Sequence, residues 1–120
     1  MSSAPRIIDG SRFDGLEGFW DEVTRALFDG QRWGRNLDAF ADLLEPGRPV
    51  RWLHGSRSRE QLGHEETARW LEERLAKVHP SNRKTFELRL AAARRGEGQT
   101  LFDTLTDVMR ERGVQLDLSE

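Results

Sequence analysis

Cysteine is absent from the 120-residue sequence, and its longest uninterrupted apolar run is Leu90–Ala93. The lack of cysteine excludes a disulfide scaffold, a thiolate nucleophile and a cysteine-ligated metal site. The short apolar run excludes a membrane span and the apolar core of a signal peptide. A chain of this length fits one domain, residues 1–120, and we expect that domain to be soluble and cytoplasmic.

Motifs of common enzyme chemistry are also missing. The sequence has no Gly-rich phosphate-binding loop, no dinucleotide-binding Gly pattern and no Gly-x-Ser-x-Gly nucleophile. Its three histidines, His54, His64 and His79, are too far apart in the sequence to indicate a metal site. We therefore expect a protein that is not an enzyme and needs no cofactor or metal.

Charge is distributed unevenly along the chain, although the formal net charge is only −2. Residues 1–49 carry 6 basic and 9 acidic side chains, residues 50–96 carry 11 and 6, and residues 97–120 carry 2 and 6. The two ends are therefore acidic and the middle is basic. If the two ends meet in space, one face of the molecule is negative, which argues against general nucleic-acid binding there.

Hydrophobic spacing and turn residues divide the chain into strands and helices. The predicted strands are Arg6–Ile8, Val50–His54 and Val114–Leu118. The predicted helices are Leu16–Leu27, Asn36–Leu44, Glu65–Val78 and Leu101–Arg112. Segment Asn82–Arg95 fits a strand or a helix, and its length and three alanines favour a helix. Asp14 and Glu17 have the spacing of a capping box in front of the first helix.

The order of these elements predicts the fold class. Strands that are separated by helices need crossover connections, and such connections join parallel strands. We therefore expect an α/β protein with a small three-stranded parallel sheet packed with helices.

The segment from Trp33 to Glu45 carries the most information about function. Gly34 permits a turn with positive φ, and Asn36 can cap the following helix. Asp38, Asp42 and Glu45 then project from one helix face, opposite the apolar stripe. Like charges at this spacing repel each other, and folding alone gives no reason to keep them.

This segment resembles the signature of the barstar family, cytoplasmic bacterial inhibitors of secreted barnase-like ribonucleases. The matching residues are Gly34, Asn36, Leu37, Asp38, Ala39, Phe40, Asp42 and Leu44. The resemblance implies that the second helix and the loop before it plug a ribonuclease active site in a 1:1 complex. It implies further that Asp42 takes the place of a substrate phosphate, that Asp38 pairs with basic groups at the rim, and that Gly34, Asn36 and the aromatic Trp33 shape the loop.

Several positions depart from the family pattern. Arg32 stands where an aromatic contact residue is common, and Ala41 replaces a bulky aromatic next to Asp42. Arg35 adds a positive charge that opposes a basic enzyme unless it points away. An acid of the last helix has no clean match, and Asp107 is the nearest candidate. Residues 57–99 look like an extra helical insertion before the last helix.

Two other functions stay open at this point. The first is an adaptor or immunity protein that keeps the fold and binds a different basic protein. The second uses the Arg-rich segment 50–96 to grip nucleic-acid phosphates. Interleaved glutamates make that segment resemble an ordinary helical surface with i,i+4 pairs, so no direct nucleic-acid contact is expected.

Overall fold

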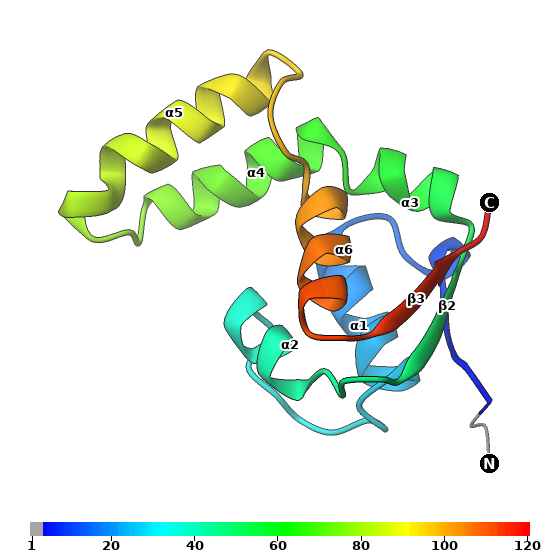
Figure 1. Ribbon diagram of the computed structural model, residues 1–120. Helices are drawn as coiled ribbons and strands as arrows, with labels where there is room; N and C mark the ends of the chain where they lie inside the picture. Colours follow the sequence, from blue (N-terminus) through cyan, green and yellow to red (C-terminus); the bar gives the residue numbers. More distant parts are fainter. Residues whose placement is uncertain (1–3) are drawn as a thin grey trace.

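The computed structural model describes residues 4–120, and its centre is a three-stranded parallel sheet (Figure 1). The strands are β1 (Arg6–Asp9), β2 (Pro49–Leu53) and β3 (Gln115–Leu118), in the order β1-β2-β3. Both pairs are parallel, and the register aligns Ile8 with Trp52 and Trp52 with Leu118. The predicted fold class and the three predicted strands are confirmed.

Six α-helices connect and extend the sheet within residues 4–120. They are α1 (Leu16–Ala26), α2 (Leu37–Leu43), α3 (Gly55–Gln61), α4 (His64–Leu75), α5 (Arg83–Arg94) and α6 (Leu101–Glu111). Segment 82–95, for which a strand was the alternative, is therefore helical. In the described part of the chain, no helix has both the length and the apolar character that crossing a membrane requires.

An aromatic core joins α1, α2 and the sheet. Phe19 of α1 stacks on Trp52 of β2, with ring centroids 5.1 Å apart, and meets Phe40 of α2 edge-on at 5.9 Å. All three side chains are fully buried. Since aromatic pairs of this kind add to the free energy of burial, α2 is held firmly against α1 despite its short length.

Helix α3 was not predicted. The sequence predicts no separate element between the strand Val50–His54 and the helix Glu65–Val78, yet α3 begins at Gly55. Its buried Ser58 accepts a hydrogen bond from Nε1 of Trp52 at 2.9 Å. This contact is tertiary, so local propensity did not reveal it.

The predicted capping box of Asp14 and Glu17 is wrong. Gly15 is the N-cap residue of α1 and offers no side chain. The free backbone N–H of Leu16 instead donates to Oε2 of Glu66 at 2.7 Å, across 50 positions of sequence. The side chain of Asp14 accepts from Arg57. The carboxylate of Glu66 in α4 therefore caps α1, which is the role that the sequence predicted for Asp14.

Helices α4 and α5 form a hairpin that projects from the rest of the molecule (Figure 1). Leu71, Leu90 and Ala93 make a small apolar cluster inside the hairpin, separate from the main core. The base of the hairpin is tied to α6 by two hydrogen bonds from α6 backbone N–H groups. Leu101 donates to Oγ1 of Thr67 at 2.8 Å, and Phe102 donates to the Leu62 carbonyl at 3.0 Å. The predicted insertion, residues 57–99, covers most of α3 and all of this hairpin.

Candidate functional site

The loop in front of α2 is anchored by Trp33. Its Nε1 donates to Oγ1 of Thr24 at 2.6 Å, and its ring meets Trp20 and Phe28 edge-on at 5.3 and 5.0 Å. Trp33 is half-buried. Its structural role in this chain is therefore to fix the loop against α1, while part of its ring stays accessible.

The turn that leads into α2 differs from the prediction. Positive φ belongs to Arg35 (53°) and not to Gly34. Gly34 is needed because a Cβ there would lie 3.0 Å from Nδ2 of Asn36 and 3.3 Å from the Cβ of Ala39. Glycine therefore provides room for the cap, whereas the strained backbone conformation falls on its neighbour.

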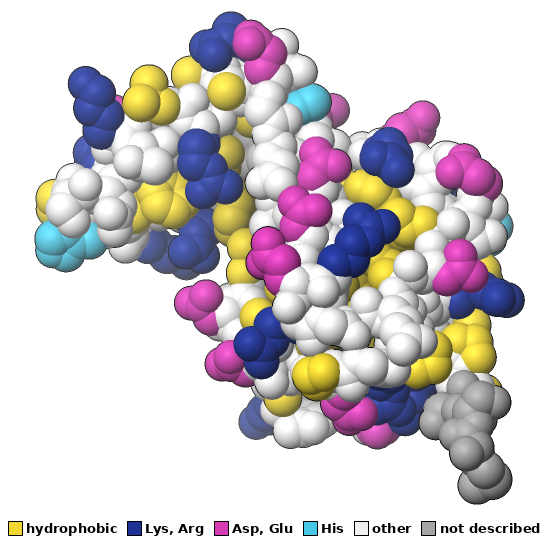
Figure 2. Space-filling view, in the orientation of Figure 1, with side chains coloured by type: hydrophobic (Ala, Val, Ile, Leu, Met, Phe, Trp, Pro, Cys, Tyr) yellow, Lys and Arg dark blue, Asp and Glu magenta, His cyan; other side chains and the backbone are white. Residues whose placement is uncertain are grey.

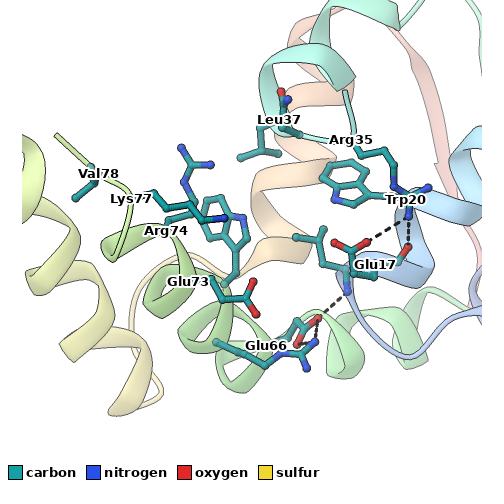
Figure 3. Close-up of a pocket in the computed structure, with 13 residues that line it drawn as sticks. Glu17, Trp20, Arg35, Leu37, Glu66, Glu73, Arg74, Lys77 and Val78 are labelled. Atoms are coloured by element: carbon teal, nitrogen blue, oxygen red, sulfur yellow. Dashed lines mark hydrogen bonds and ion pairs between the residues drawn. The ribbon is translucent and has the colours of Figure 1, made fainter. Parts of the chain in front are cut away.

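Arg35 points away from the exposed face of α2. Its guanidinium donates to Asp21 at 2.8 Å. It also donates to the Glu17 carboxylate at 3.3 Å and to the Glu17 carbonyl at 3.1 Å (Figure 3). Burial lowers the pKa of Arg35, but the hydrogen bonds to these two carboxylates more than offset it, so the pKa is raised overall. The charge that would oppose a basic partner is thus neutralised within the chain.

Helix α2 begins where the sequence predicted. Asn36 is its N-cap residue and accepts a hydrogen bond from the Ala39 backbone N–H at 2.8 Å. Phe40 is fully buried and Leu37 is half-buried, so this side of the helix faces the core. Helical periodicity then turns Asp38 and Asp42 outward.

The outward face carries two unpaired carboxylates. Asp38 and Asp42 are both exposed, and neither makes a hydrogen bond or ion pair through its side chain within residues 4–120. Glu45 differs, because Oε2 of its side chain pairs with Arg48 at 2.7 Å. The predicted set of three free acids is therefore reduced to two.

The remaining predicted site residues are Asp107, Ala41 and Arg32. Thr104 of α6 lines the same groove as Asp38, and Asp107 follows one turn later. Asp107 is exposed and accepts from Nε2 of Gln99 at 2.6 Å. Ala41 is half-buried, and Arg32 is exposed in the loop. Figure 2 shows acidic side chains over this part of the molecule, beside the basic hairpin.

Most of the arginines that suggested nucleic-acid binding are paired with acids of the same chain. The ion pairs are Arg51–Asp117, Arg57–Asp14, Arg69–Glu66, Arg83–Glu87, Arg94–Glu72 and Arg95–Glu97. Residues 50–96 contain nine arginines, and the three that remain lie over aromatic rings. Arg59 lies over Phe102, and Arg74 and Arg89 lie over Trp70 and Phe86. A segment with this much internal pairing has few cations left for phosphates.

Sequence reasoning missed the groove between α2 and the hairpin. The groove has a volume of about 540 Å³ and is lined by Asp38 on the side of α2. The opposite wall consists of Trp70, Arg74, Phe86 and Arg89 of the hairpin. Trp70 and Arg74 are four residues apart on α4, which places them on one face. That spacing was a usable signal for a shared face, but the approach of α5 and α2 to it depends on the tertiary structure.

Comparison with known proteins gives one match. A sequence model of the family described as Barstar (barnase inhibitor) matches residues 4–119. Searches of the curated proteins and of the solved structures gave no match. The family match covers nearly the whole chain, including the hairpin, and is consistent with the three-stranded parallel sheet. The chain belongs to the Barstar (barnase inhibitor) family.

Proposed function

We propose that this protein inhibits a small ribonuclease by covering its active site with α2 and the preceding loop, in a 1:1 complex. The observation that carries the proposal is the pair of exposed carboxylates of Asp38 and Asp42, which have no partner within residues 4–120, on a helix that packs against the core through Phe40. Family membership supports a ribonuclease as the partner. A phosphate-binding active site is rich in basic groups, so a carboxylate there replaces a substrate phosphate.

The two acids have different roles in this proposal. Asp42 enters the active site, and Asp38 pairs with basic groups at its rim. Neither carboxylate has to break an internal ion pair before binding, which keeps the cost of association low. Complementary charge also accelerates the encounter with a basic enzyme.

The test measures cleavage of RNA by a panel of small secreted ribonucleases in the presence of the protein. We expect at least one enzyme to be inhibited, and Asp42→Ala to raise the inhibition constant about 30-fold or more. Removing one partner of a buried charge pair costs about 2–5 kcal/mol, which corresponds to this range. Inhibition that persists unchanged in Asp42→Ala would contradict the proposed role.

Glu60→Ala is the matched control. Glu60 is also an exposed acid on a seven-residue helix, α3, and α3 lies away from α2 in the fold (Figure 1). We expect this variant to inhibit as the unmodified protein does, within about twofold. If no ribonuclease of a broad panel is inhibited, the result favours the alternative function, in which this protein is an adaptor or immunity protein whose acidic face binds a different basic protein.

A further inference from the structure

The wall of the hairpin that faces α2 combines aromatic rings with unpaired cations. The guanidinium of Arg74 lies 5.2 Å from the ring of Trp70 and 5.8 Å from that of Phe86. Arg89 lies 5.8 and 5.5 Å from the same two rings. Both rings are half-buried and both arginines are exposed. The stacking orients the guanidinium groups while their N–H groups remain available.

These two arginines differ from the other arginines of the hairpin. Arg69, Arg83, Arg94 and Arg95 each pair with a glutamate, as described above, whereas Arg74 and Arg89 have no acidic partner within residues 4–120. Excess positive charge therefore lies on the wall that faces α2.

Two neighbouring grooves run along this wall and share Trp70 and Arg74. One, of about 540 Å³, includes Asp38 and Arg89. The other, of about 380 Å³, includes Arg35, Glu73 and Lys77 (Figure 3). Lys77 adds a further cation without an ion pair in the described chain, and Glu73 offsets one charge of this wall. Residues Asn36 and Leu37 of the α2 side line both grooves.

We propose that the groove of about 540 Å³ binds an acidic segment of a polypeptide. The carboxylates of the segment lie on Arg74 and Arg89, and its aliphatic parts lie on Trp70 and Phe86. That the segment belongs to the enzyme held by α2 rests on the proposed function. The partner would then carry an acidic loop beside its basic active site. The two walls of opposite charge set the orientation in which it binds.

Charge complementarity favours a peptide over nucleic acid in this place. A nucleic acid brings one charge per nucleotide and would set phosphates against Asp38, which lines the same groove. A peptide can place its carboxylates at the spacing of the two arginines, with uncharged residues beside Asp38. Guanidinium groups bind carboxylates and phosphates alike through two parallel hydrogen bonds, so the spacing of the charges makes the difference. A peptide segment can therefore use the two arginines without approaching Asp38.

The test uses a fluorescein-labelled hexapeptide of alternating Glu and Leu, its Gln/Leu counterpart and a labelled uridylate hexanucleotide. Fluorescence anisotropy at low salt measures the binding of each to the full chain. We expect the acidic peptide to bind on the order of tenfold more tightly than the other two. We also expect Arg74→Glu with Arg89→Glu to weaken its binding on the order of tenfold or more.

Lys84→Glu with Arg95→Glu is the matched control, because it makes the same change of charge on hairpin residues that do not line the two grooves. We expect it to bind the acidic peptide within about twofold of the unmodified chain. Arg74→Gln with Arg89→Gln should also weaken binding, which excludes an effect of introduced acids. Thermal unfolding of each variant establishes that it is folded.

Three results would overturn the inference: tighter binding of the hexanucleotide than of the acidic peptide, equal losses in both charge-reversal variants, or equal binding of the acidic peptide and its Gln/Leu counterpart. The proposed function fails separately. Asp42→Ala should raise the inhibition constant for the ribonuclease as described above and leave peptide binding intact. If the protein binds the acidic peptide but inhibits no ribonuclease, the proposal for the groove is supported and the proposed inhibitor function is contradicted. In an inhibited enzyme, Arg74→Glu with Arg89→Glu should raise the inhibition constant on the order of tenfold.

Discussion

Replacement of Glu66 by alanine tests how the hairpin is joined to the rest of the fold. Glu66 lies in the first turn of α4, and its side chain is only 12% exposed. Oε2 accepts the hydrogen bond from the Leu16 backbone N–H, and Oε1 lies 2.8 Å from Arg69. Glu66→Ala removes the only side-chain cap that the structure gives to α1, since Gly15 has none.

The expected cost follows from these contacts. Loss of a capping side chain costs about 0.5–2 kcal/mol, and hydrogen bonds to charged groups lie at the upper end of such ranges. The i,i+3 pair with Arg69, whose own side chain is exposed, adds about 0.2–0.5 kcal/mol. We expect the free energy of unfolding to fall by about 1.5–2 kcal/mol, which lowers Tm by about 6 °C in a chain of this size.

Urea denaturation followed by tryptophan fluorescence measures this change. Glu65→Ala is the matched control, because Glu65 is an exposed acid in the same first turn and interacts mainly with the helix dipole. That loss should stay below about 0.7 kcal/mol. Asp14→Ala should cost less than about 1 kcal/mol, since the Asp14 side chain is 85% exposed. Equal effects of Glu66→Ala and Glu65→Ala, or a larger effect of Asp14→Ala, would refute the assignment of the cap.

Two further predictions concern the support of α2 and the edge of the sheet. Phe40→Ala should lower the free energy of unfolding by about 3–5 kcal/mol in the same urea titration, because Phe40 is fully buried among aromatic rings; a loss below about 1 kcal/mol would contradict this packing. Hydrogen bonds from the Ser11 side chain and backbone lower the pKa of Asp9. This carboxyl therefore adds stability that is complete above its unfolded pKa and is lost as pH falls through the folded pKa. Ser11→Ala should raise the folded pKa of Asp9, which an NMR titration of the carboxyl carbon between about pH 2 and 6 measures; an unchanged pKa would contradict the role of Ser11.

The fold and the acidic helix were accessible from the sequence because their signals are local. Apolar periodicity marks α1, α4 and α6, and strand–helix alternation requires parallel pairing. Asn36 sits one residue before the helix it caps. The outward direction of Asp38 and Asp42 then follows from the buried position of Phe40 on the same helix.

The features that sequence reasoning missed depend on contacts between distant segments. Glu66 caps α1 from 50 positions away, and α3 is supported by the bond between Ser58 and Trp52. The direction of Arg35 depends on a positive φ at a non-glycine residue, which is uncommon and is compensated here by acids of α1. Trp52 and Ser58 are only six positions apart but belong to different elements, and the members of the other pairs are 14 to 50 positions apart in the sequence.

The separate interior of the hairpin has a consequence for how this protein can diverge. Trp70 packs against both apolar clusters, and the part of the hairpin that projects past Trp70 is stabilised by its own side chains. Its outer surface can therefore change in charge, and its tip in length, while the helix that carries Asp38 and Asp42 keeps its shape. If the proposed function holds, a change confined to the hairpin alters which enzyme is bound and leaves the acidic helix as it is.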